Sequence, residues 1–562
     1  MTFVSGIIAT ALLLSPCAHA SNDYQLGHKI RAIVERPEFK SCKWGIMAQE
    51  TNTSIRDGGL IYANSGASLF SVPASNGKLP TTFAAWLSLG PNYQFETSIG
   101  VTVADDGRTG SSVNVTLCGA NDPSLTSPQL QAAAIEAISR EPLIKAAAFV
   151  RVRVDNRRGS DATFPGSWEW GDLQFDYGAA PASVILDGNV VPVVVEPSGG
   201  GSIGALAVVS LPAPGSNECF AVVNEVVTAP MGESSSVSAS FEVRSGLFSL
   251  VLSGSVAVAS GTRSGSGLTR SGAHRGRKGQ DTAVVASASG GGAVELEVSC
   301  RDPLRRAGDA LVEFLREGGA PNAAAAAEGE FVVTDASECD GGVAGHSFAD
   351  RVGFARAAPA TALSAAATMT SERLEILLNH TLLESDNTYA EAIFRRQGPD
   401  GSYARSMEAV RATLAAWEPA PALAAAPHST HSGLASSETN ASTTASVLDL
   451  EEYSAVDGSG LSRHDLVTPA FLASLLSFAD QRYVSLLPLA GVSGTLSDRF
   501  KGTAAEGRLR AKTGTMTNVN ALSGVVGSVA FSILSDSCPQ PPSTVRQGID
   551  EIAVLFAELD PQ

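Results

Sequence analysis

A serine and a lysine stand three residues apart in Ser75-Asn76-Gly77-Lys78, just before an apolar segment from Phe83 to Leu89. If a helix starts near Ser75, this spacing puts the hydroxyl of Ser75 and the amine of Lys78 on one face, one turn apart. A serine attacks a carbonyl well only when a base takes its proton. The spacing therefore predicts a nucleophile with its own base.

Lys78 can act as that base only when it is neutral. Its pKa must then fall from about 10.4 toward about 7 or 8, which takes roughly 4 kcal/mol at about 1.4 kcal/mol per pKa unit. A second cation in the same cleft supplies part of this by like-charge repulsion. The candidate is Lys512, which opens Lys512-Thr513-Gly514-Thr515.

A third motif, Ser385-Asp386-Asn387, lies between the other two, and each of the three occurs once. Singly, each also fits an ordinary structure: a solvated helix face, a helix-capping turn or a strand end. In this order, however, the three motifs form the set typical of penicillin-binding proteins and class A β-lactamases.

The residues around the motifs resemble one family more closely: the low-molecular-mass (class C) penicillin-binding proteins. These are D-alanyl-D-alanine carboxypeptidases and endopeptidases with a large insertion in the catalytic domain. The matching stretches are Val72–Leu79, Pro165–Trp170, Tyr177–Ala179, Asp457–Arg463 and Lys512–Thr515. They are spread over most of the chain, so the resemblance is not confined to one motif.

The resemblance implies that the reaction proceeds through an acyl-enzyme on Ser75. Two kinds of partner would form it: peptidoglycan stem peptides ending in D-Ala-D-Ala, and β-lactam antibiotics. In such an enzyme Lys78 is the base and Lys512 the second cation. Ser385 relays a proton between Lys78 and the leaving amine. Asn387 hydrogen-bonds the amide of the substrate and steadies Lys78.

The same resemblance assigns substrate binding to the strand that carries the third motif. Thr513 and Thr515 hold the terminal carboxylate of the substrate, and the backbone N–H groups of Ser75 and Thr515 form the oxyanion hole. The peptide lies antiparallel along this strand, as in strand addition. Gly514 lets a backbone approach closely.

Two other functions compete with a carboxypeptidase or endopeptidase. A class A β-lactamase uses a deacylating Glu-x-x-Leu-Asn motif downstream of Ser-Asp-Asn, and the sequence has none there. A catalytically inactive muropeptide-binding or scaffold protein is disfavoured because every catalytic residue type is present. The sequence leaves open whether carboxypeptidase or endopeptidase activity dominates.

The charge of the chain disfavours two classes of binding partner. The formal net charge of -18 argues against nucleic acid and against an anionic membrane surface, because both would repel the chain. No Cys-x-x-Cys and no His/Cys spacing indicates a metal site, and no cofactor is expected.

Residues 1–20 are typical of a secretory signal peptide, with an apolar run at residues 7–14 and a small-residue site at Ala18-His19-Ala20. The run is too short to span a bilayer, so no integral membrane span is expected. Export to a periplasm or cell envelope follows, with a plastid as the other possibility. Cleavage after Ala20 leaves six Cys, which permit up to three disulfides in 15 possible pairings.

The chain of 562 residues is long enough for two or three domains. Ser75 and Ser385 lie 310 residues apart, which requires an inserted domain between them. We predict an α+β fold: a β-lactamase/transpeptidase-like catalytic domain, its antiparallel sheet flanked by helices, interrupted by a large, mostly β insertion of two nested domains. The predicted boundaries are 21–100 and 345–562 for the catalytic domain, 101–167 and 292–344 for the inserted domain, and 168–291 for the nested one.

Local patterns place the motifs. Ser385-Asp386-Asn387 is expected on a turn between two helices, and Lys512-Thr513-Gly514 on a strand beside a hairpin that turns at Gly527-Ser528. Pro80 is expected to bend the start of the Ser75 helix without breaking it. Asp457-Gly458-Ser459-Gly460 is interpreted as a structural turn near the cleft rather than a catalytic element.

Overall fold

The computed structural model describes residues 15–104, 112–156, 164–244, 247–259, 283–288, 291–325, 333–334, 339, 365–419 and 448–559. Helix α1 (Ser15–Val34) begins inside the predicted signal peptide, whose residues 1–14 lie outside the described ranges. Cleavage after Ala20 stays a prediction. No helix in the described ranges has both the length and the apolar character needed to cross a membrane.

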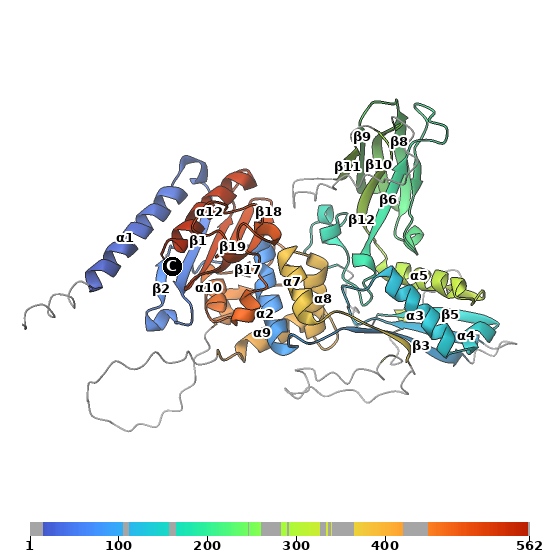
Figure 1. The fold of residues 1–562 in the computed structure, drawn as a ribbon, viewed down its shortest axis with the longest axis horizontal. Helices are drawn as coiled ribbons and strands as arrows, with labels where there is room; N and C mark the ends of the chain where they lie inside the picture. The colour runs from blue at the N-terminus through green and yellow to red at the C-terminus, as the bar shows by residue number, and fades with distance from the viewer. Residues whose placement is uncertain are drawn as a thin grey trace, which may run out of the picture.

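Both ends of the chain build one antiparallel sheet of five strands, in the order β18-β19-β20-β1-β2. The strands are β1 (Lys43–Glu50), β2 (Leu60–Ala63), β18 (Arg510–Met516), β19 (Val519–Val526) and β20 (Val529–Asp536). In Figure 1 the blue N-terminal strands lie in the same sheet as the red C-terminal ones. The predicted Gly527-Ser528 hairpin is confirmed, since it joins β19 to β20.

Helices cover both faces of this sheet. On one face, α1 and α12 (Pro542–Ala557) share a core with the sheet that includes Ile30, Phe531 and Phe556. On the other face, α10 (Pro469–Ser477) packs on the strands, and a second core joins it to a helical cluster. That cluster comprises α2 (Lys78–Ser88), α7 (Leu374–Leu383), α8 (Asn387–Gln397) and α9 (Tyr403–Ala415). All eight residues of β19 are therefore buried.

The chain between α2 and α7 forms a second body around its own sheet. The sheet has the order β13-β5-β4-β3-β15, with β14 also paired to β5, and α3 and α5 share its core. Its elements are β3 (Glu96–Ala104), β4 (Ser112–Cys118), α3 (Ser127–Arg140), α4 (Leu143–Ala146), β5 (Phe149–Asp155), α5 (Pro303–Glu317), β13 (Ala323–Ala325), β14 (Val333–Thr334) and β15 (Ala365–Thr370).

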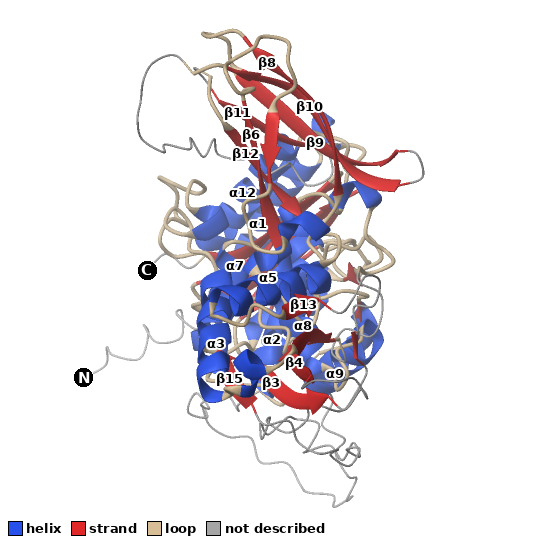
Figure 2. Ribbon diagram, turned by 90° about the vertical axis from the view of Figure 1, so that its right-hand side faces the viewer, coloured by secondary structure: helices blue, strands red, loops and turns tan. Residues whose placement is uncertain are grey.

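A third body is nested within the second and consists of two sheets that share one core. The sheets have the orders β11-β9-β10-β8 and β12-β6-β7. Figure 2 shows them standing at one end of the molecule. The strands are β6 (Val190–Glu196), β7 (Val208–Ser210), β8 (Ala221–Ala229), β9 (Ser235–Arg244), β10 (Leu247–Ala257), β11 (Val284–Ala288) and β12 (Val294–Ser299).

The predicted α+β class and the antiparallel sheet flanked by helices are confirmed. The division into domains stays a prediction. At three of its boundaries, however, strands lie on the other side from the sheet to which they belong. The boundary at 100/101 cuts through β3, and β12 lies just beyond the predicted end of the nested domain at 291. Strand β15 pairs with β3 of the inserted sheet, although its residues fall in the range assigned to the catalytic domain. These boundaries depend on pairing between strands that are far apart in the sequence, and a local sequence pattern does not reveal such pairing.

Three disulfides join the six Cys: Cys42 to Cys538, Cys118 to Cys339 and Cys219 to Cys300. The first lies beside the paired strands β1 and β20 of the five-stranded sheet. The other two lie in the inserted bodies, so each part of the molecule has a covalent link of its own.

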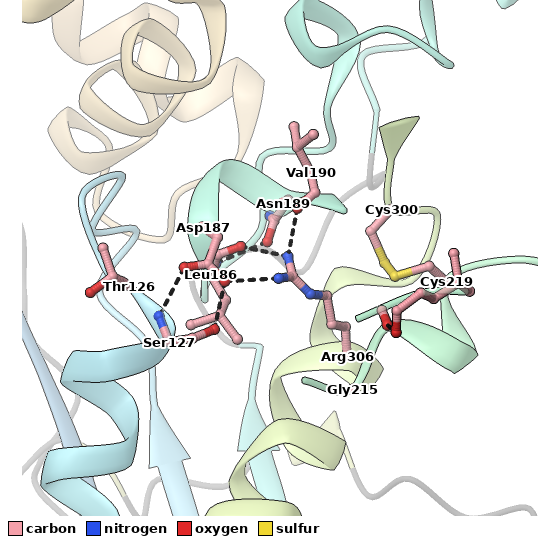
Figure 3. A network of polar contacts seen from close by, with 12 residues as sticks. Thr126, Ser127, Leu186, Asp187, Asn189, Val190, Gly215, Cys219, Cys300 and Arg306 are labelled. Atoms are coloured by element: carbon pink, nitrogen blue, oxygen red, sulfur yellow. Dashed lines mark hydrogen bonds and ion pairs between the residues drawn. A yellow bond between two sulfur atoms is a disulfide. The ribbon is translucent and has the colours of Figure 1, made fainter. Parts of the chain in front are cut away.

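A buried arginine joins the inserted bodies, as Figure 3 shows. Arg306, on α5, is fully buried and donates to the carbonyl oxygens of Leu186 and Val190 and to the carboxylate of Asp187. The same carboxylate accepts from the backbone and side chain of Ser127, at the start of α3. Burial lowers the pKa of Arg306, while the charge of Asp187 opposes that shift. The network fixes α3 and α5 against the segment that enters the nested body.

Candidate active site

The nucleophile candidate lies on a tight turn. Residues Ala74–Gly77 form a 3-10 turn that leads directly into α2 at Lys78, where the sequence predicts a helix from about Ser75. Ala74 has a left-handed φ of 47°. Pro80 is the third residue of α2, where a backbone N–H has no intrahelical partner, so the helix continues as predicted.

Lys78 is fully buried and surrounded by hydrogen-bond partners. Its Nζ lies 3.1 Å from Ser75 Oγ, 2.6 Å from Asn387 Oδ1 and 2.8 Å from the carbonyl oxygen of Ser459. Two of these partners, the amide oxygen of Asn387 and the carbonyl of Ser459, can only accept. A neutral amine that donates two N–H groups to them has its lone pair available for the Ser75 hydroxyl.

The Ser385-Asp386-Asn387 motif lies on the turn between α7 and α8, as predicted. Ser385 has a left-handed φ of 61°, a conformation that costs a non-glycine residue free energy and is common at functional sites. Asp386 stabilises the turn, since its side chain accepts from Tyr389 N and so caps α8. Its other oxygen lies 3.3 Å from the His380 ring.

Burial alone would raise the pKa of Asp386, but hydrogen bonds from His380 and from the Tyr389 N–H lower it below its ordinary value. The carboxylate that holds this turn is thus stabilised in its charged form.

Lys512 reaches the same turn from the sheet. It is fully buried, and its Nζ donates to Ser385 Oγ at 2.9 Å and to the carbonyl of Thr513 at 2.9 Å. The motif lies on β18, an edge strand beside the β19–β20 hairpin, as predicted. The outer side of this strand pairs only at Arg510, with Leu489, among the described residues.

Gly514 allows a close approach, but by the protein itself. A Cβ there would lie 2.8 Å from the carbonyl oxygen of Pro73 and 2.9 Å from the Asn76 amide. The glycine therefore lets the turn that carries Ser75 press against β18. The approaching backbone is thus that of Pro73, not that of a bound peptide as predicted.

The predicted site residues are thus assembled from three separate segments. Ser75, Lys78 and Asn387 share one set of hydrogen bonds, and Lys512 with Ser385 forms a second. Ser75, Ser385, Asn387, Thr513 and Thr515 line one pocket, and Gly514 is packed behind it.

Sequence reasoning missed three contributors to the site. The carbonyl of Ser459 contacts Lys78, so the loop that the sequence marks only as a structural turn reaches that amine. Thr495 accepts from Thr513 Oγ1 at 2.9 Å and also lines the pocket. Tyr177 accepts from Asn387 Nδ2 through its carbonyl. Two of the three contacts use backbone carbonyls, which every residue has, so residue type gives no signal for them.

The Ser459 loop is held by two buried carboxyl groups. Glu391, on α8, accepts from the backbone N–H groups of Gly458 and Ser459. Asp457 accepts from Gly460 N through one oxygen and from Ser462 N through the other, both at 2.7 Å. All the residues that form these bonds are buried, so the carbonyl that faces Lys78 has a fixed position.

Gly460 is expected not to tolerate a side chain. Its φ is +76°, and a Cβ there would lie 1.9 Å from the carbonyl oxygen of Ala74, beside Ser75. We expect Gly460→Ala to lower the free energy of unfolding by about 3 kcal/mol or more, because backbone must move. Urea denaturation measures this. Gly502→Ala is the control, because its φ of +75° imposes the same strain with nothing within 4 Å; equal losses would contradict the clash.

Glu391 gives the fold a pH dependence. Burial, followed by the charge of Asp457, raises the pKa of Glu391 to about 8. A carboxyl with a raised pKa in the folded state contributes stability that is present below its unfolded pKa and is lost as pH rises through the folded pKa. We therefore expect Glu391→Gln to flatten the fall in melting temperature between about pH 5 and about pH 8.5. Glu408→Gln, on the exposed face of α9, is the control; parallel curves for Glu391→Gln and wild type would contradict this.

The pocket at Ser75 has a volume of about 550 Å³. Its other wall comes from the inserted bodies and includes Tyr177, Asp187 and Glu297. A pocket of this size can hold a short peptide segment. Within the described ranges, no group of three or more His, Cys, Asp and Glu side chains could hold a metal ion.

A model of the D-Ala-D-Ala carboxypeptidase 3 (S13) family matches residues 26–274 and 421–558. Penicillin-sensitive carboxypeptidase A of Dictyostelium discoideum is 26% identical over 551 residues, which cover 93% of this chain and 89% of the relative. D-alanyl-D-alanine carboxypeptidase of Actinomadura sp. (strain R39) is 47% identical over 116 residues, which cover 18% of this chain and 21% of that relative.

The structure is similar to the crystal structure of penicillin binding protein 4 (dacB) from Haemophilus influenzae. The TM-score is 0.61 with 20% sequence identity, and the match covers 94% of this chain and 99% of the other. At this identity the likeness shows a shared fold.

Proposed function

Because the chain belongs to the D-Ala-D-Ala carboxypeptidase 3 (S13) family, we propose that the residues around Lys78 carry out the reaction of that family. The protein is a serine-type D-Ala-D-Ala carboxypeptidase that acts on peptidoglycan through an acyl-enzyme. The observation that supports our assignment of roles is the contact of one buried amine with Ser75, Asn387 and Ser459.

In the first step Ser75 Oγ attacks the carbonyl carbon of the penultimate D-Ala while Lys78 takes the hydroxyl proton. The backbone N–H groups of Ser75 and Thr515 stabilise the developing oxyanion. Ser385, oriented by Lys512, passes the proton from Lys78 to the nitrogen of the terminal D-Ala. The C–N bond breaks, D-Ala leaves, and an ester to Ser75 remains.

In the second step water takes the place of Ser75. Lys78 accepts a proton from the water as it attacks the ester carbonyl, and returns a proton to Ser75 Oγ as the C–O bond breaks. The products are the shortened stem peptide and the original enzyme. Thr513 and Thr515 bind the terminal carboxylate of the substrate along the outer edge of β18.

Stem peptides ending in D-Ala-D-Ala and β-lactams are the proposed partners, and export is the proposed route to them. The three disulfides support an oxidising compartment, such as a periplasm or cell envelope. The signal peptide at residues 1–20 would direct the chain there.

The test combines a substrate and an inhibitor. We expect the purified protein to release D-Ala from a diacyl-L-Lys-D-Ala-D-Ala tripeptide. Fluorescent penicillin should form one stable adduct per chain, which peptide mass spectrometry maps to Ser75. An adduct that is released rapidly would instead indicate a β-lactamase. A folded protein without adduct or turnover would indicate a muropeptide-binding protein. A cross-linked muropeptide dimer as a second substrate measures the endopeptidase activity.

A further inference from the structure

An inserted segment touches the loop that contacts Lys78. The indole Nε1 of Trp168 donates to Asp457 Oδ2 at 2.9 Å, although the two residues are 289 positions apart. Trp168 is 8% exposed, so this hydrogen bond is shielded from water. Next to it, Glu169 pairs with Arg463 at the other end of the loop.

A short series of hydrogen bonds connects Trp168 to the amine of Lys78. Asp457 Oδ2 accepts from both Trp168 and Ser462, while Oδ1 accepts from Gly460. Ser459 lies between Asp457 and Gly460, and its carbonyl oxygen is 2.8 Å from Lys78.

From these contacts we propose that Trp168 is a positioning residue for Lys78. Its N–H fixes Asp457, Asp457 fixes the backbone at Gly460 and Ser462, and the Ser459 carbonyl is thereby held where it accepts from the amine. The inference rests on the proposed function, in which Lys78 removes the proton of Ser75. It assigns to the inserted segment a role in orienting Lys78 for proton transfer, in addition to any role in binding substrate.

Asp457 explains why a single N–H group matters. A buried carboxylate oxygen that loses one of two donors is poorly satisfied and shifts to recover a partner. The Gly460 N–H that Asp457 accepts from belongs to the same planar peptide unit as the Ser459 carbonyl, so a shift of Asp457 moves that carbonyl. Proton transfer depends steeply on such distances, and a misplacement of about 1 Å costs up to about 100-fold in rate.

The indole ring and its N–H have separable roles. The ring packs with Leu173 and Leu461 in a small apolar cluster and so contributes to folding. Trp168→Phe keeps an aromatic ring in that cluster and removes the donor. Trp170→Phe is a matched control, because Trp170 is 54% exposed and its ring lies against Phe248 instead.

The experiment uses the full-length protein and fluorescent penicillin under saturating conditions, which separates the acylation rate constant from the binding constant of the penicillin. We expect Trp168→Phe to slow acylation roughly tenfold or more. Labelling should still reach one adduct per chain with an unchanged binding constant. A merely structural role would lower the labelled fraction and the melting temperature and leave the rate constant of the folded fraction unchanged.

The outcomes separate this inference from the proposed function. A Trp168→Phe protein that acylates at the wild-type rate would overturn the inference alone, as would an equal loss in Trp170→Phe. Absence of a Ser75 adduct on the wild type would overturn the proposed function and the inference with it. If Trp168→Phe does not fold, Asp457→Asn decides, because it keeps the size of the side chain and replaces the oxygen that accepts from Trp168 and Ser462. It should slow acylation with full labelling, and an unchanged rate would overturn the inference.

Discussion

Replacing Ser75 by alanine is expected to abolish the penicillin adduct and to lower D-Ala release by roughly five to six orders of magnitude. The reason is chemical, because the substitution removes the atom that forms the ester. The cost in stability should be small, since Ser75 lies on the 3-10 turn and only its hydroxyl is lost. Intact mass after incubation with penicillin, beside D-Ala release, measures both effects.

Ser88→Ala is the control for this variant, because Ser88 is the last residue of the helix that the Ser75 turn begins. It should label and turn over like the wild type. A Ser75→Ala protein that still forms the adduct would place the nucleophile elsewhere and refute the assignment of the turn.

Replacing Lys78 by methionine is expected to slow acylation by roughly three to four orders of magnitude. Methionine has a similar length, so it fills the buried space, but it neither takes a proton nor donates to Asn387 Oδ1 and the Ser459 carbonyl. The acylation rate constant measured with fluorescent penicillin checks this expectation. The variant should fold, although two buried acceptors lose a donor.

Lys501→Met is the control for Lys78→Met, because Lys501 is exposed and bonded to Asp498 outside the pocket. Acylation of Lys78→Met within about tenfold of wild type would mean that another group takes the proton of Ser75. Lys512 would then be the next residue to replace, since it contacts Ser385 in the same pocket.

Some contacts of the site can be predicted from the sequence, and others cannot. The approach of Lys78 to Ser75 follows from local spacing, because neighbouring turns fix it. The approach of Asn387 and Lys512 follows only from the resemblance of three motifs to a family. The Ser459 carbonyl could not be predicted, because it acts through the backbone and depends on bonds to Glu391 and Asp457.

The fold shows the same distinction. Alternating and apolar runs identified the β19–β20 hairpin, since these patterns are local. Pairings between distant strands set the edges of the inserted sheet and the partners of the Cys residues. Cys42 and Cys538 are 496 positions apart and meet only because β1 pairs with β20. Six Cys alone leave every pairing open.

The placement of β1 between β2 and β20 has a consequence for how the protein is made. Ser75 leaves the ribosome long before Lys512, by roughly 20–90 s at about 5–20 residues per second. In that interval the inserted bodies can fold, since each has a core of its own. The sheet that brings Lys512 close to the Ser75 turn closes only with the β19–β20 hairpin. Penicillin binding should therefore report a chain that has been synthesised almost to its end.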